Sequence, residues 1–147
     1  MVSVDLELRN PGLLRSFRRP RQRLHLLQGD SGSAEMIARV RELLPDGVDF
    51  LFIDGDHSYE GVRRDFEAYR GLVRPGGLIA FHDIVQDRGS RGGPATVAWS
   101  GEVPRFWSEV KADCRHRELI ADPDQDGAGI GVLFTPRPDR RSPVEAP

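Results

Sequence analysis

Cysteine and lysine are almost absent from this sequence, which has Cys114 and Lys111 as the single residue of each type. A lone cysteine can form no disulfide within the chain and cannot build a zinc site of paired thiolates. No apolar run approaches the roughly 20 residues that a membrane-spanning helix needs, and the N-terminus has no basic stretch before an apolar core. We therefore expect a cytoplasmic protein with no membrane partner and no export signal.

The chain also has little excess charge, with a formal net charge of −2. Its one basic cluster comprises Arg15, Arg18, Arg19, Arg21 and Arg23. Such a cluster can bind phosphate, but the only aromatic residue among these arginines is Phe17, so a stacking platform for bases is missing. We expect a solvated segment here and no nucleic-acid partner.

What the sequence does contain is an alternation of short apolar segments with helical patterns, which is typical of α/β domains. Strands are predicted at 2–6, 24–27, 48–53, 78–81, 118–121 and 130–134, and helical segments at 13–17, 33–44, 58–73 and 103–112. Ser33 and Ser58 are the expected N-caps. A turn is expected at 74–77, and a mobile loop at 86–94, where the composition is polar and rich in glycine.

The segment 48–53 is nearly continuous in apolar residues, as is typical of a strand buried on both faces of a parallel sheet. A helix and a second apolar strand at 78–81 follow it with the spacing of a right-handed crossover. We therefore expect a three-layer α/β domain at residues 1–135, with a Rossmann-like, doubly wound, mostly parallel sheet and a C-terminal antiparallel hairpin. Residues 136–147 are rich in proline and charge, and we expect a disordered tail.

Polar residues follow each of the predicted parallel strands at its carboxyl end. These residues are Asp5 and Glu7, Asp30 and Ser31, Asp54 to His57, and His82 with Asp83. Each acid by itself is explained equally well as a solvated loop residue or a helix cap. Because ligands of open parallel sheets bind beyond the carboxyl ends of the strands, four strands ending in this way predict a functional site at that edge.

Asp54, His82 and Asp83 are candidate metal ligands at neighbouring strand ends. Two carboxylates and an imidazole favour magnesium or manganese, and the imidazole also tolerates iron or zinc. The alternative is structural, with His82 bonded to a loop carbonyl and Asp83 capping the next segment.

His57 lies three residues beyond Asp54 and is the candidate catalytic residue. An imidazole that titrates near neutral pH is suited to remove a proton from a hydroxyl group, and a nearby divalent cation would lower the pKa of that hydroxyl. The alternative is that His57 belongs to the first helical turn and packs against Tyr59.

The sequence resembles class I S-adenosylmethionine-dependent methyltransferases in three places. These are the run from Phe50 to Val62 (Phe-Leu-Phe-Ile-Asp-Gly-Asp-His-Ser-Tyr-Glu-Gly-Val), the residue Asp65, and the segment 72–84 with its Pro-Gly-Gly and Phe-His-Asp-Ile. The resemblance is closest to the branch with the macrolide sugar O-methyltransferases and the cephalosporin-pathway methyltransferase-like proteins. It covers roughly residues 1–135.

The resemblance implies S-adenosylmethionine as the cofactor. By position, Asp5 corresponds to the acid that binds the ribose hydroxyls, and Asp30 and Ser31 to the adenine-side contacts. Asp54 counts among the cofactor-binding residues and, with His82 and Asp83, among those that hold magnesium in the metal-dependent members. His57 matches the proposed general base. The sequence departs from those members at His82, where a carboxylate or amide is usual.

The resemblance also implies a strand and a glycine-rich loop before Val2, and the sequence has no counterpart of them. In the family sheet this strand lies between the strands that end at Asp5 and at Asp54. We therefore expect a domain incomplete at its N-terminus, with two unpaired central edges. We expect residues 1–147 alone to bind S-adenosylmethionine weakly or not at all, and to be unstable or to associate with themselves through these edges. A homo-oligomer is among the expected partners.

The function expected from the sequence is S-adenosylmethionine-dependent O-methylation of a small-molecule acceptor, on a hydroxyl of a sugar or small natural product, with a divalent metal assisting. Two alternatives stay open. A metal-dependent phosphohydrolase is one, because an apolar strand ending in Asp-Gly-Asp can present an aspartyl nucleophile. The other is a non-catalytic, truncated methyltransferase-like subunit.

Overall fold

The computed structural model describes residues 1–137, in which strands and helices alternate along the chain. The elements are β1 (Val2–Asp5), α1 (Pro11–Ser16), β2 (His25–Gln28), α2 (Ala34–Leu43), β3 (Val48–Ile53), α3 (Tyr59–Tyr69), a 3-10 turn (Arg70–Leu72), β4 (Val73–His82), α4 (Val103–Val110), β5 (His116–Leu119) and β6 (Ile130–Phe134). Most of the predicted tail lies outside the described residues, and the domain boundary at residue 135 stays a prediction. No helix in the described part is both long and apolar enough to cross a membrane.

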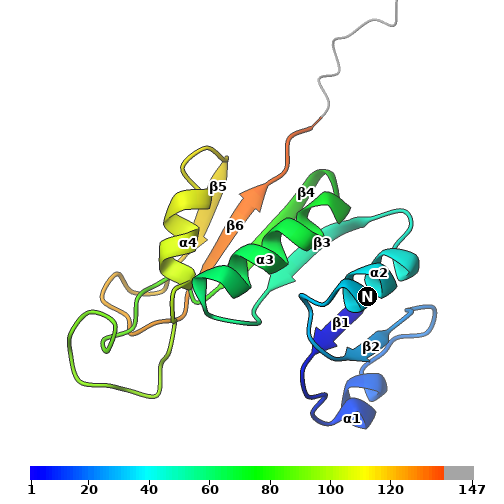
Figure 1. The fold of residues 1–147 in the computed structure, drawn as a ribbon, viewed down its shortest axis with the longest axis horizontal. Coiled ribbons are helices and arrows are strands. Elements are labelled where there is room, and N and C mark those ends of the chain that lie inside the picture. The colour runs from blue at the N-terminus through cyan, green and yellow to red at the C-terminus, as the bar shows by residue number, and fades with distance from the viewer. Residues whose placement is uncertain (138–147) are drawn as a thin grey trace, which may run out of the picture.

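The strands form two sheets (Figure 1). β1 and β2 pair in parallel, and the second sheet has the order β3-β4-β6-β5. β3 and β4 are parallel neighbours, whereas β6 runs antiparallel to both β4 and β5. The Rossmann-like α/β fold, the parallel pair and the C-terminal hairpin are therefore confirmed. The hairpin differs from the prediction in that β5 begins two residues earlier, at His116.

The two sheets have four outer strand edges within residues 1–137, and those of β1 and β3 are two of them. β1 pairs only with β2, and β3 pairs only with β4. These are the two edges that the family resemblance predicts to be open. Each presents unpaired backbone N–H and C=O groups to any strand that approaches it.

The core lies between the four-stranded sheet and the two helices α3 and α4, which cover one of its faces (Figure 1). Phe81 and Leu133 of the sheet pack with Trp107 of α4, and all three are almost fully buried. Side chains alternate along a strand, so Phe50 and Phe52 point away from this core and are 55% and 44% exposed. The expected third layer is therefore absent from residues 1–137, where no helix covers the opposite face of this sheet.

β4 is longer than predicted and contains the predicted turn as a bulge. Val48 pairs with Val73 and Phe50 with Leu78, so the four residues 74–77 of β4 lie opposite the single residue Asp49 of β3. A Cβ on Gly77 would lie 2.9 Å from the carbonyl oxygen of Asp49, which leaves no room for a side chain. The Pro-Gly-Gly run thus locally interrupts the pairing of the strand without ending it.

Both predicted N-caps are confirmed. The Ser33 hydroxyl accepts a hydrogen bond from Met36 N at 3.2 Å, and the Ser58 hydroxyl accepts one from Gly61 N at 3.0 Å. These caps fix where α2 and α3 begin. They therefore place Asp30 and Ser31 just before α2, and Asp54 to His57 just before α3.

Candidate active site at the carboxyl ends of the strands

Four side chains gather where β3 and β4 end, because parallel neighbours deliver their carboxyl ends to the same edge. His57 Nε2 lies 3.6 Å from Asp54 Oδ1 and 3.6 Å from Asp83 Oδ2. His82 Nδ1 lies 3.4 Å from Asp54 Oδ1 and 2.9 Å from Asp83 Oδ2. The predicted catalytic and metal residues therefore form one cluster.

The backbone at this cluster has an uncommon conformation. Asp83 has a φ of 58°, in the left-handed region that few residues other than glycine adopt. Asparagine and aspartate tolerate this conformation best among the other residues, and such strain is concentrated at functional sites. The turn follows β4 directly and positions the Asp83 carboxylate between the two imidazoles.

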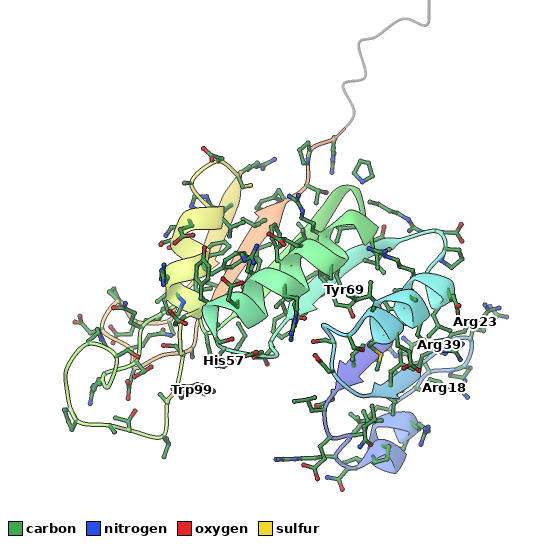
Figure 2. All side chains as sticks on the ribbon, in the orientation of Figure 1. Arg18, Arg23, Arg39, His57, Tyr69 and Trp99 are labelled. Carbon is green, nitrogen blue, oxygen red and sulfur yellow. The ribbon has the colours of Figure 1, made fainter. Side chains whose placement is uncertain are left out.

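His57 has a partner that the sequence did not reveal. Its Nδ1 lies 3.0 Å from the backbone carbonyl oxygen of Trp99, and the imidazole stacks on the Trp99 indole at 5.1 Å and 26° (Figure 2). A carbonyl oxygen only accepts hydrogen bonds, so Nδ1 must carry the proton and donate it. The alternative that His57 packs against Tyr59 is not what the structure shows, since the stacking partner is Trp99.

The cluster contains more acceptors than donors, as expected of a cation site. When Nδ1 of a neutral His57 carries the proton, the lone pair of Nε2 faces the carboxylates of Asp54 and Asp83. His82 Nδ1 is buried and, although it lies 2.9 Å from Asp83 Oδ2, it makes no hydrogen bond of acceptable angle in the described structure. Ligand atoms of Asp54, His57 and Asp83 all lie within 4.8 Å of one another. A divalent cation, or a second proton on His57, would satisfy these groups, so the residues present fit a metal.

The predicted cofactor residues lie at the other sheet and at the end of β3. Asp5 ends β1, is exposed, and accepts a hydrogen bond from Glu7 N at 3.0 Å. Asp30 follows β2 and accepts from Gly32 N at 2.9 Å, and its carboxylate lies 3.3 Å from Arg64 Nη2. Asp54 belongs to the cluster described above. Asp5 and Asp30 are thus carboxylates at the ends of paired parallel strands.

Ser31 connects these two regions through α3. Its hydroxyl donates to Asp65 Oδ1 at 2.8 Å, and its carbonyl accepts from the Tyr69 hydroxyl at 2.5 Å. Burial raises the pKa of the Asp65 carboxyl, and burial together with the Asp65 charge raises the pKa of Tyr69 to about 12. No role was predicted for either residue. The available signal was an acid on the buried face of α3, three residues from Val62 and four from Tyr69.

Lys111 and three of the arginines do not take part in the cluster. Lys111 pairs with Glu118 of β5 at 2.6 Å, and Arg18, Arg23 and Arg39 lie on the side of the molecule away from His57 and Trp99 (Figure 2). A phosphohydrolase needs a cation beside the transferred phosphate. The only lysine is already paired elsewhere, which disfavours that alternative.

Comparisons with known proteins agree with the fold. Residues 1–84 match the model of a methyltransferase domain family. The chain is 46% identical over 79 residues to the uncharacterized protein R132 of Acanthamoeba polyphaga mimivirus, a match that covers 54% of the chain and 31% of the viral protein.

Two solved structures are similar over most of the chain. MycE methyltransferase from the mycinamycin biosynthetic pathway, in complex with Mg, SAH and mycinamycin VI, is 21% identical with a TM-score of 0.57, over 99% of this chain and 39% of MycE. The apo structure of CalS11, a TDP-rhamnose 3'-O-methyltransferase of calicheamicin biosynthesis, is 19% identical with a TM-score of 0.55, over 90% of this chain and 57% of CalS11.

The structural neighbours confirm the Rossmann-like fold, and the family model confirms the resemblance to methyltransferases seen in the sequence. The chain belongs to the methyltransferase domain family, whose model matches more than half of its residues. It spans about a third of the length of the viral relative and about two fifths of that of MycE.

Proposed function

We propose that this chain is part of an S-adenosylmethionine-dependent O-methyltransferase that methylates a hydroxyl group of a sugar or another small natural product, with a divalent cation assisting. The single observation that carries the proposal is the orientation of His57. Its Nδ1 is bonded to the Trp99 carbonyl, and its Nε2 faces Asp54 and Asp83 at the carboxyl edge of the sheet. Family membership, the mycinamycin VI bound to MycE and the TDP-rhamnose methylated by CalS11 support the choice of a small hydroxylated acceptor.

His57 acts as the general base in this proposal. The Trp99 carbonyl keeps the proton on Nδ1, so Nε2 has the lone pair that removes a proton from the acceptor hydroxyl. The His57 side chain is only 13% exposed, which limits competition from water for that lone pair. The stacked Trp99 indole restrains rotation of the ring.

The carboxylates at the ends of β1 and β2 bind the cofactor. Asp5 is suited to accept hydrogen bonds from two ribose hydroxyls, and Asp30 and Ser31 border the adenine side. The Ser31 O–H already donates to Asp65, so Ser31 contacts the cofactor with its backbone or as an acceptor. When bound, S-adenosylmethionine supplies a sulfonium methyl group, which passes to the acceptor oxygen and leaves S-adenosylhomocysteine.

Asp54, His82 and Asp83 are the residues that would hold the cation. A bound divalent cation lowers the pKa of a nearby hydroxyl. The set has two carboxylates and one imidazole, and His57 would add a second imidazole if its Nε2 also bound the metal. Because a metal-bound Nε2 cannot accept a proton, the base role requires that His57 stay outside the metal shell.

A methyl-transfer assay tests the proposal. The protein is incubated with S-adenosylmethionine labelled in the methyl group, with Mg²⁺ or Mn²⁺, and with a panel of hydroxylated sugars and macrolides. We expect label in an ether on one class of acceptor, and loss of transfer when the cation is chelated.

Two parallel measurements identify the alternatives. Hydrolysis of an aryl phosphate in place of methyl transfer would establish the phosphohydrolase. Calorimetry with S-adenosylhomocysteine that shows no heat of binding, together with no transfer, would establish a non-catalytic subunit.

A further inference from the structure

Asp87 is a buried carboxylate with no part in the site described above. Only 4% of it is exposed, and it accepts hydrogen bonds from Ser90 and Ser100. Ser90 donates with its backbone N and its hydroxyl, both at 2.8 Å. Ser100 donates with its backbone N at 3.0 Å and its hydroxyl at 2.9 Å. These four bonds keep the pKa of Asp87 below its usual range, so the residue is a fixed anion.

The contact between Asp87 and Ser100 joins the two ends of a long loop. The two residues are 13 positions apart, and Asp87 N donates in return to the Ser100 hydroxyl at 3.1 Å. Ser100 is fully buried. We call this reciprocal pair the Asp87 clasp. This pair fixes the position of the main chain around Ser100, which includes residues 99–102.

That preceding residue is Trp99, whose carbonyl holds His57. The indole of Trp99 is 68% exposed, so burial of its own side chain does not fix the position of its backbone. The clasp is the nearest buried attachment of this backbone. The position of the Trp99 carbonyl oxygen, 3.0 Å from His57 Nδ1, therefore depends on Asp87.

The same segment also holds the main chain of His57. Glu102 N donates to the carbonyl oxygen of His57 at 2.8 Å. Gly101, between Ser100 and Glu102, has a φ of +56°, and a Cβ there would lie 2.5 Å from that same carbonyl oxygen. Residues 99–102 thus contact both the backbone and the ring of His57. At position 101, only glycine allows the main chain to lie so close to the His57 carbonyl oxygen.

We propose that Asp87 is a positioning residue for His57, acting through Ser100 and the Trp99 carbonyl to keep the proton on Nδ1 and the lone pair on Nε2. The proposal rests on the proposed function of His57 as the base. In this proposal, Asp87 contacts neither the substrate nor the cofactor. Without the clasp, the Trp99 carbonyl moves and Nδ1 loses the acceptor that it has in the described structure, so the tautomer with the proton on Nε2, beside two carboxylates, is favoured.

The test measures the tautomer of His57 directly. Long-range ¹H–¹⁵N spectra of the metal-free protein, recorded where the imidazole is neutral, distinguish a protonated Nδ1 from a protonated Nε2. The His57→Gln protein identifies which signals belong to His57. The variants are Asp87→Asn, Ser100→Ala and, as the matched control, Ser90→Ala, which removes a bond to the same carboxylate away from Trp99.

We expect a protonated Nδ1 in the starting protein and in Ser90→Ala, and a shift toward protonated Nε2 in Asp87→Asn and Ser100→Ala. Turnover should fall about ten- to a hundredfold in the latter two, within the contribution of a positioned base, with little change in the KM for S-adenosylmethionine. Ser100→Ala keeps the buried acid and its Ser90 bonds, so it serves where Asp87→Asn fails to fold.

An unchanged His57 tautomer in Ser100→Ala, or equal shifts in Ser100→Ala and Ser90→Ala, would overturn the positioning role. A shifted tautomer with unchanged turnover would support the link from Asp87 to His57 and show that His57 is not the base. The two proposals therefore fail in different ways.

Discussion

The Ser31 hydroxyl donates a 2.8 Å hydrogen bond to the buried carboxylate of Asp65, and this bond joins the end of the β1–β2 sheet to α3 beside the second sheet. The two sheets share no strand pairing in residues 1–137, so side-chain contacts such as this one set their relative position. Asp30 is the neighbour of Ser31. The geometry of the proposed adenine side therefore depends on Asp65.

Asp65→Ala should weaken binding of S-adenosylhomocysteine by about tenfold, the loss expected for a hydrogen bond to a charged group. Glu67→Ala is the matched control, because Glu67 lies two residues along the same helix with its side chain 54% exposed. Calorimetric titration compares the two. Equal affinities for both variants would show that Asp65 does not organise the cofactor loop.

Asp65 should also make the stability of the protein depend on pH. Burial raises its folded-state pKa above the ordinary value of 3.8, so its contribution to stability is complete below that value and is lost as pH rises through the raised folded-state pKa. Asp65→Asn removes this dependence. The difference in unfolding free energy between the two proteins should change in favour of Asp65→Asn as pH increases, as measured by urea denaturation at several pH values; a constant difference would contradict it.

In a protein that also contains the family's first strand and glycine-rich loop, His57→Ala should lower turnover by about two to four orders of magnitude, the usual range for a general base. The His57 side chain contacts Asp54, Asp83 and Trp99, and neither Asp5 nor Asp30 in the described structure, so the affinity for S-adenosylhomocysteine should barely change. Single-turnover methyl transfer and calorimetry on the same samples measure both quantities. Unchanged turnover would leave His57 with a packing role against Trp99.

Asp83→Asn should abolish tight binding of Mn²⁺ with little change in melting temperature. Asparagine adopts the left-handed conformation of Asp83 as readily as aspartate, so the backbone is not strained, whereas a charged ligand is lost. Electron paramagnetic resonance of added Mn²⁺ reports the bound fraction. Mn²⁺ bound as tightly as before would exclude Asp83 as a ligand.

Phe50→Ser should reduce self-association of the 147-residue chain. Phe50 is 55% exposed on β3, whose edge is unpaired in the described residues. Exposed apolar side chains beside an open strand edge favour association. Val97→Ser, at an exposed apolar position outside the strands, is the control, and sedimentation velocity over a range of concentrations is the measurement. A monomer at all concentrations before substitution would contradict the expectation.

The strand ends of the site were predictable because the sequence marks them locally. The apolar run Val48–Ile53 ends abruptly at Asp54, and β4 ends at His82, so the parallel topology brings these residues together. The fold class followed from the same alternation of apolar segments and helices. The bulge in β4 was not predictable, because Pro-Gly-Gly is equally typical of a turn and only the pairing with β3 shows that the strand continues.

The residues that hold the site were not predictable from local patterns. Trp99 and Asp87 lie in a stretch whose composition is typical of a mobile loop, and their roles arise from contacts across 42 and 13 positions. Asp65 did leave a trace, as an acid on the buried stripe of α3. That pattern indicates a buried polar contact, but it does not identify the residue that makes the contact.

A ¹⁵N–¹H NMR titration of the chain with S-adenosylhomocysteine tests most directly whether the carboxyl edge of the sheets binds the cofactor, because it detects weak binding and locates it. We predict saturable, concentration-dependent shifts of amide signals that are confined to residues 5–7, 30–32 and 54–57. Absence of shifts at millimolar ligand, or shifts confined to the arginine-rich segment 15–23, would contradict a cofactor site at this edge.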